Sequence, residues 1–134
     1  MSVVEGLMSG QTGLAVQRSQ VMIEGLWTGE WDSTVLGQAG EGAGVFIFRD
    51  GRIYGGSARY YFFGEYHLAG EQVRATLLIS HYSGPPSGLL GPVDEGQISL
   101  VGTLAGDEMV LKTGEQDEAF SLAARLVKRT GISR

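Results

Sequence analysis

Two copies of a Gly-x-Trp motif, Gly25-Leu26-Trp27 and Gly29-Glu30-Trp31, open about a hundred residues of short alternating segments separated by glycine turns. A Gly-x-Trp at the start of the first long strand is typical of small up-and-down β-barrels, which close on themselves. The interior of such a barrel is either packed with side chains or holds one small ligand. The motif therefore constrains architecture more than chemistry, and we expect an all-β, eight-stranded antiparallel up-and-down β-barrel.

The strands are expected to follow one another as an antiparallel meander. Asp50-Gly51 lies between two β-rich runs and predicts a two-residue hairpin turn, because both central residues of that turn need positive φ. The turn would pair Phe48 with Ile53 and Ile47 with Tyr54. The apolar residues of the last strand would also suit a helix. The expected strands are Leu26–Thr34, Val45–Arg49, the run after Gly51, Tyr60–Leu68, Gln72–Tyr82, Gln97–Leu104, Glu108–Thr113 and Phe120–Lys128.

Glycine-rich segments are expected to form the connections. Gly37–Gly44 precedes a strand and is not followed by Lys-Ser or Lys-Thr, so it predicts a flexible barrel loop rather than a phosphate cradle. The tetrads Leu68–Glu71 and Leu104–Asp107 read Leu-Ala-Gly-Glu and Leu-Ala-Gly-Asp. We expect one turn chemistry used twice in these tetrads, and no repeat with a fixed period.

Charge and composition exclude several classes of protein. The formal net charge of −5 and the pI near 4.9 argue against a nucleic-acid or membrane-surface binder, because phosphate contacts need clustered lysine and arginine. The chain has no cysteine for a disulfide or a thiolate metal site. No apolar run approaches the roughly 18 residues of a membrane span. The first fifteen residues contain Glu5 but no lysine or arginine, which does not fit a secretion signal. A cytoplasmic protein is expected.

One folded domain is expected over residues 23–134, since a chain of 134 residues is most simply a single domain. Residues 1–22 show neither strand alternation nor a sustained helical stripe. They are either an over-extended start ahead of Met22 or an arm that packs on a neighbouring subunit, and the sequence leaves both open.

Two of the expected strands carry apolar residues on both faces, unlike an ordinary sheet with one face in water. Phe46, Ile47 and Phe48 show no alternation, and Tyr60–Phe63 places two aromatic residues on each face. Such strands need a second cover, and we expect a homodimer to provide it rather than the N-terminal arm. The expected dimer contacts are Phe46, Phe48, Tyr61 and Phe63.

No pattern of residues indicates catalysis. Ser80 and Ser83 flank His81, but neighbouring residues of a strand point to opposite faces and the chain has no Gly-x-Ser-x-Gly elbow. His67 and His81 are the only histidines, and zinc would need a third or fourth ligand. We therefore expect no enzyme, no metal and no cofactor.

Two groups of residues are candidates for binding. Aromatic residues of the first and fourth strands would line a cavity or a packed core, namely Trp27, Trp31, Tyr60, Phe62 and Tyr66. The long loop over residues 80–92 would be a lid or a partner surface, because a loop of this length in a compact barrel is usually functional or mobile. Its candidate contact residues are His81, Tyr82, Leu89 and Leu90.

Three segments resemble the GrlR-like family, small proteobacterial β-barrels first recognised as negative regulators of type III secretion genes. These segments are Gly42–Gly56, Tyr60–Tyr66 and Ile79–Tyr82, within a similarity that spans Ile23–Gly114. The resemblance implies a lipocalin-like barrel, a homodimer, and sequestration of a partner transcriptional activator without DNA contact. In the regulator that founded the family, the turn after the fourth strand carries an acidic cluster implicated in binding the activator. Only Glu71 carries over to that turn here.

Two functions from different classes remain. The first is a regulatory or interaction module whose loops bind another protein, and the resemblance favours it. The second is a carrier that holds a small apolar ligand inside the barrel. An internal apolar void or a bound molecule would favour the carrier, whereas a solid core would eliminate it.

Overall fold

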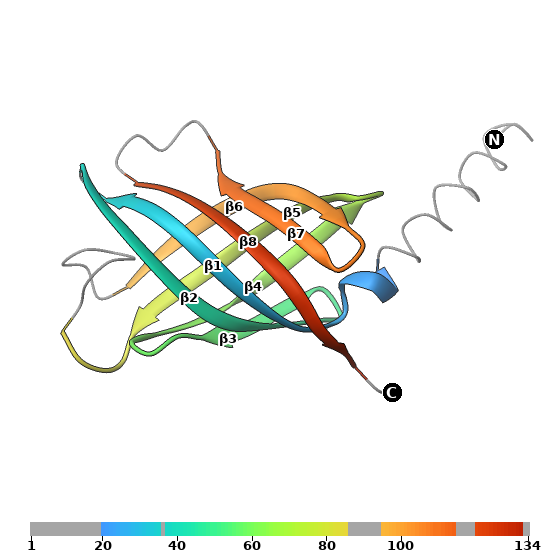
Figure 1. The fold of residues 1–134 in the computed structure, drawn as a ribbon, viewed down its shortest axis with the longest axis horizontal. Coiled ribbons are helices and arrows are strands. Elements are labelled where there is room, and N and C mark those ends of the chain that lie inside the picture. The colour runs from blue at the N-terminus through green and yellow to red at the C-terminus, as the bar shows by residue number, and fades with distance from the viewer. Residues whose placement is uncertain (1–19, 36, 86–94, 115–119, 133–134) are drawn as a thin grey trace, which may run out of the picture.

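A computed structural model describes residues 20–35, 37–85, 95–114 and 120–132. Each strand pairs antiparallel with the next, and the last returns to pair with the first, which closes the sheet into a barrel (Figure 1). The predicted all-β, eight-stranded up-and-down barrel is confirmed. The strands are β1 Gly25–Val35, β2 Gln38–Arg49, β3 Arg52–Gly56, β4 Tyr60–Ala69, β5 Gln72–His81, β6 Glu95–Ala105, β7 Glu108–Thr113 and β8 Phe120–Gly131.

The hairpin between β2 and β3 has the predicted turn and register. Asp50 and Gly51 have φ of 51° and 78°, so both central residues adopt the left-handed conformation that this turn requires. Phe48 lies opposite Ile53, and Ile47 lies opposite Tyr54. Since the side-chain period of a strand is two, this turn fixes which residues of the two strands share a face.

The expected loop over Gly37–Gly44 is wrong for most of its length. β2 begins at Gln38 and pairs with β1 without interruption. The glycines instead make room for a large ring, because a Cβ at Gly42 would lie 2.6 Å from Nε1 of Trp31 and one at Gly44 would lie 3.1 Å from Cη2 of Trp31. A run that reads as a flexible loop is therefore a strand that passes close to the Trp31 indole.

The connections between β4 and β5 and between β6 and β7 share one turn type with each other, as the repeated tetrads predict. Gly70 and Gly106 both have φ of 63° and occupy the first position of two-residue turns, between β4 and β5 and between β6 and β7. A positive φ at the first central position but not at the second, which is Glu71 or Asp107 here, defines a type II′ turn, whose twist matches that of the flanking strands. The last strand is β8 and not a helix.

The core occupies the interior of the barrel, and alternate residues of every strand contribute to it. Trp27 and Trp31 are buried on the inward face of β1, with Gly29 between them. Their neighbours across the sheet are Phe46 opposite Trp27 and Gly42 opposite Trp31. Ile23, two residues before the start of β1, is fully buried and closes one end of this core.

Candidate functional site

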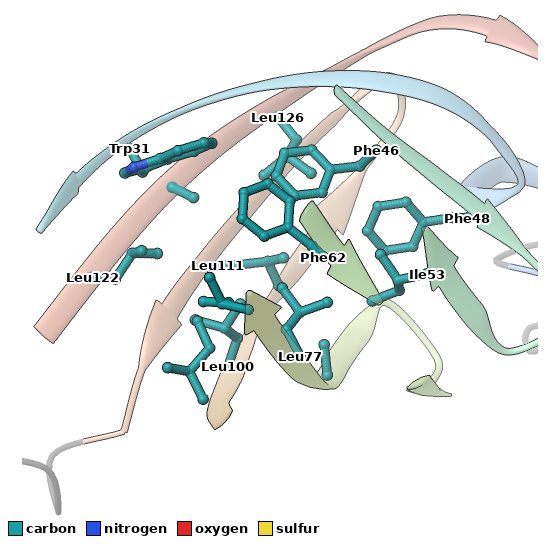
Figure 2. A pocket seen from close by; sticks show the side chains of 14 residues that line it. Trp31, Phe46, Phe48, Ile53, Phe62, Leu77, Leu100, Leu111, Leu122 and Leu126 are labelled. Carbon is teal, nitrogen blue, oxygen red and sulfur yellow. The ribbon is translucent and has the colours of Figure 1, made fainter. Parts of the chain in front are cut away.

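The barrel interior contains a small apolar cavity. Its volume is about 30 Å³, and aliphatic and aromatic side chains from all eight strands line it. Figure 2 shows the rings of Phe46 and Phe62 beside each other, with Trp31 on one side of them and Phe48 on the other. Phe46 and Phe62 stack with ring centroids 5.3 Å apart, and Trp31 stands edge-on to both at 6.2 and 5.8 Å.

The size of this cavity decides between a filled core and a binding chamber. Pockets for drug-sized ligands measure roughly 300–1,000 Å³, and a cavity that admits benzene measures about 150 Å³. The observed space of about 30 Å³ is several times smaller than either. The described part of the core is therefore packed with side chains and has no room for an organic ligand.

All five predicted core residues are buried, but only Trp31 and Phe62 line the cavity. Trp27 lies toward the end closed by Ile23 and packs edge-on to Phe48. Tyr60 packs against the ring of His81 at the other end, with centroids 5.5 Å apart. The remaining residue, Tyr66, packs against the ring of Phe48 at 5.3 Å.

A short segment before β1, residues 20–24, lies at one end of the barrel (Figure 1, blue). Ile23 and Glu24 are buried there, and we call this segment the plug. The Trp27 indole donates to the carbonyl of Ile23 at 2.8 Å, and the Glu24 carboxylate accepts from the backbone N–H of Asp50 at 2.8 Å. The Gln20 side-chain amide donates to the Tyr66 hydroxyl at 2.9 Å. Burial raises the pKa of this hydroxyl and outweighs its hydrogen bonds with Gly51 and Gln20. The segment therefore holds together parts of two strands, β1 and β4, and the turn between β2 and β3.

Gln20→Ala should lower the free energy of unfolding by about 1 kcal/mol, the typical contribution of one hydrogen bond. The reason is that the buried Tyr66 ring would lose the amide that satisfies its hydroxyl. Val21→Ala is the control, because Val21 is next in the chain and 71% exposed. Urea denaturation measures both, and equal midpoints would contradict a bonding role for Gln20.

The choice between an over-extended start and an arm stays a prediction, since residues 1–19 lie outside the described residues.

The predicted dimer contacts divide between the two faces of the wall. Phe46 and Phe48 are 7% and 1% exposed, so their assignment to a dimer contact is wrong. Phe46 lies opposite Trp27 and therefore shares its inward face. Tyr61 and Phe63 are 46% and 47% exposed on the outer face.

The outer face carries an apolar surface, of which the sequence predicts Tyr61 and Phe63 but not Ile47 and Tyr54. Ile47, Tyr54, Phe63 and Leu78 are successive cross-strand neighbours over β2, β3, β4 and β5. The register of the Asp50-Gly51 hairpin places Ile47 with Tyr54 on one face and Phe48 with Ile53 on the other, and both faces are apolar, so the hairpin alone carries no signal for the outward one. We call the exposed side chains of this region the apolar face, and it comprises Val45, Ile47, Tyr54, Tyr61, Phe63 and Tyr82.

The candidate residues of the long loop are described only at its start. Tyr82 is exposed, its hydroxyl donates to the carbonyl of Ser57 at 2.7 Å, and its ring lies 6.2 Å from that of Tyr61. The imidazole Nε2 of His81 lies 2.9 Å from the carbonyl oxygen of Ser83. Leu89 and Leu90 lie outside the described residues. Glu71, from the turn between β4 and β5, is exposed.

The two histidines do not come together. His67 lies opposite Arg74, whereas His81 lies opposite Tyr60 at the other end of the same strand pair. Within the described ranges, no three histidine, aspartate or glutamate side chains are grouped as metal ligands would be. In the same ranges, no helix has the length and apolar character needed to cross a bilayer.

The fold places the protein among closed, eight-stranded antiparallel barrels with a packed interior. The sequence matches no protein-family model and no curated protein. A shared fold does not identify a function. The features that distinguish this barrel are its filled core, its plugged end and its outer surface.

Proposed function

We propose that the protein is a non-enzymatic interaction barrel that acts as a dimer in the cytoplasm and binds a partner protein. This role is that of the GrlR-like negative regulators that its sequence resembles, which sequester a transcriptional activator. The filled interior is the observation that carries the proposal. With a cavity of about 30 Å³, the side chains available for recognition are those on the outside of the wall and in the loops.

The apolar face supports self-association. The six side chains of this face are each 41–57% exposed. A large aromatic side chain buries 150–250 Å² when fully covered, so covering the exposed half of all six removes on the order of 500–700 Å² from water. A stable interface buries about 800 Å² on each partner. The face therefore supplies most of the area that a dimer contact needs.

Replacing two aromatic residues of this face, Tyr54→Ser with Phe63→Ser, should convert a dimer to a monomer. Each removed ring loses roughly 1–3 kcal/mol of apolar contact, and each change occurs once per subunit, so we expect the dimer to weaken at least about 100-fold. The control is Val101→Ser with Val110→Ser, which removes two exposed valines outside the face. Sedimentation velocity at micromolar concentration measures both. A wild-type monomer under these conditions would contradict the proposal.

The alternative, a carrier of apolar ligands, is tested by titrating the protein with a fluorescent apolar probe such as anilinonaphthalene sulfonate. A filled core predicts no saturable binding with one probe per barrel. Saturable binding that Trp31→Ala alters, while the apolar-face variant leaves it unchanged, would place a ligand in the barrel and favour the carrier.

Sequestration of an activator has its own test. Deleting the gene should raise transcription of the activator's targets, and overproducing the protein should lower it. The purified activator should form a complex with the barrel, and the barrel alone should leave the mobility of the target DNA unchanged. Unchanged transcript levels in both strains would overturn the regulatory role.

A further inference from the structure

A second outer surface lies over β2, β1, β8 and β7, and it adjoins the apolar face on β2, where Val45 is the next outward residue after Ala43. It is a groove of about 790 Å³ whose lining includes Glu30, Asp32, Glu41, Ala43, Ala123 and Arg125. We call it the Ala43 groove. Cross-strand pairing sets two rows across it, Ala43–Glu30–Arg125 and Glu41–Asp32–Ala123.

Small residues keep this groove open, and the barrel itself does not require all of them. Gly42 accommodates the Trp31 ring on the inside of the wall. Ala43 and Ala123 point outward and are exposed, so no core contact requires an alanine at either position. Alanine is depleted in strands, where larger branched or aromatic residues stabilise the sheet. The two alanines leave a hollow where larger side chains would fill it.

Two of the charges in the groove lower the stability of the sheet. Asp32 lies directly opposite Glu41, and like charges in directly opposed positions destabilise an antiparallel pair. Within the described ranges, no lysine or arginine forms an ion pair with either carboxylate. The guanidinium of Arg125 instead pairs with Glu108 at 2.6 Å. The groove lining therefore carries three carboxylates, Glu30, Asp32 and Glu41, against the single guanidinium of Arg125, and the next residue along the second row is Lys112, opposite Ala123.

We propose that the Ala43 groove binds an extended segment of the partner protein that carries lysine or arginine, with Asp32 and Glu41 receiving one cationic side chain. The proposal rests on the proposed function, since a barrel that captures another protein needs a surface besides the face that joins two copies. Charge complementarity selects this occupant: a cation between the two carboxylates relieves their repulsion, and small residues on either side admit a main chain.

A labelled peptide of alternating lysine and alanine, eight residues long, is the probe. It should bind the wild-type protein saturably at low salt, and the matching glutamate–alanine peptide should not bind. Asp32→Asn with Glu41→Gln should weaken binding roughly five-fold or more and also raise the melting temperature by roughly 1–4 °C. This combination of gained stability and lost binding is the signature of charges retained for a ligand.

Two further variants separate the groove from general acidity. Glu65→Gln with Asp107→Asn changes the net charge equally at two exposed positions outside the groove, and screening over that distance should keep its effect within about two-fold. Ala43→Tyr fills the groove without changing charge and should abolish binding while the protein stays folded by circular dichroism.

Three outcomes overturn the proposal. Equal weakening by both acid pairs would show nonspecific attraction, and weakening by the Glu65/Asp107 pair alone would place the site outside the groove. Binding that survives Ala43→Tyr would exclude the groove. Sedimentation reports on the apolar face independently, so a failed groove with an intact dimer leaves the proposed function standing.

Discussion

Trp27→Ala is expected to lower the free energy of unfolding by about 3–5 kcal/mol, the usual cost of removing a large aromatic side chain from a core. Trp27 is fully buried and packs edge-on to Phe48 at 6.1 Å. Its indole N–H also satisfies the Ile23 carbonyl at 2.8 Å. The substitution therefore opens a cavity and releases the plug at the same time. Because small domains are stable by only about 5–15 kcal/mol, the variant should unfold at a much lower urea concentration.

Two comparisons isolate the cause of this loss. Trp27→Phe restores most of the ring but not the N–H, so its effect should be intermediate, about 1–3 kcal/mol. Tyr54→Ala removes an aromatic residue that is 52% exposed, and in the monomeric state it should cost under about 1 kcal/mol. If Trp27→Ala cost no more than Tyr54→Ala, Trp27 would not hold the end of the barrel together.

Gly102→Ala is expected to destabilise the barrel by at least about 2–3 kcal/mol, in the range of overpacked cores. Gly102 lies in β6 opposite Leu111 of β7. A Cβ there would fall onto the Val110 carbonyl oxygen and lie 2.9 Å from the Cα of Leu111. Both obstacles belong to the backbone, so relief requires the two strands to move apart and not merely a side chain to rotate.

Gly114→Ala is the matched control, because a Cβ at Gly114 would meet nothing within 4 Å. It should change stability by less than about 0.5 kcal/mol. Gly64→Ala should behave like Gly102→Ala, since its Cβ would meet the backbone of Thr76 and Leu77. Identical melting temperatures for the Gly102 and Gly114 variants would show that the strand spacing adjusts at little cost.

The strand order and several turns could be predicted because they depend on local chemistry. Asp50-Gly51 and the two Leu-Ala-Gly tetrads each specify a turn through one or two residues with positive φ. The error over Gly37–Gly44 has the opposite cause. There the glycines leave space for the Trp31 ring of the neighbouring strand. This contact between strands cannot be predicted from the local sequence.

The candidate site was predicted less completely, and for a related reason. The sequence pattern predicts Phe46 and Phe48 as dimer contacts, because a run of three apolar residues does not reveal which face of the strand is the core. The register that places Trp27 opposite Phe46 resolves this, and it exposes Ile47 and Tyr54 instead. The plug was missed because its buried residue, Ile23, precedes the first strand and lies outside any alternating pattern.

The pairing of β1 with β2 on one side and with β8 on the other, from Gly25 to Val35, has a consequence for the proposed binding of a partner protein. Along β1 the wall has no free edge to which a partner could add a strand. Recognition by this part of the wall must then use outward side chains alone. Because inward and outward residues alternate, substitutions on the outside should redirect partner choice while the inward residues keep the fold, so that specificity and stability vary at different positions.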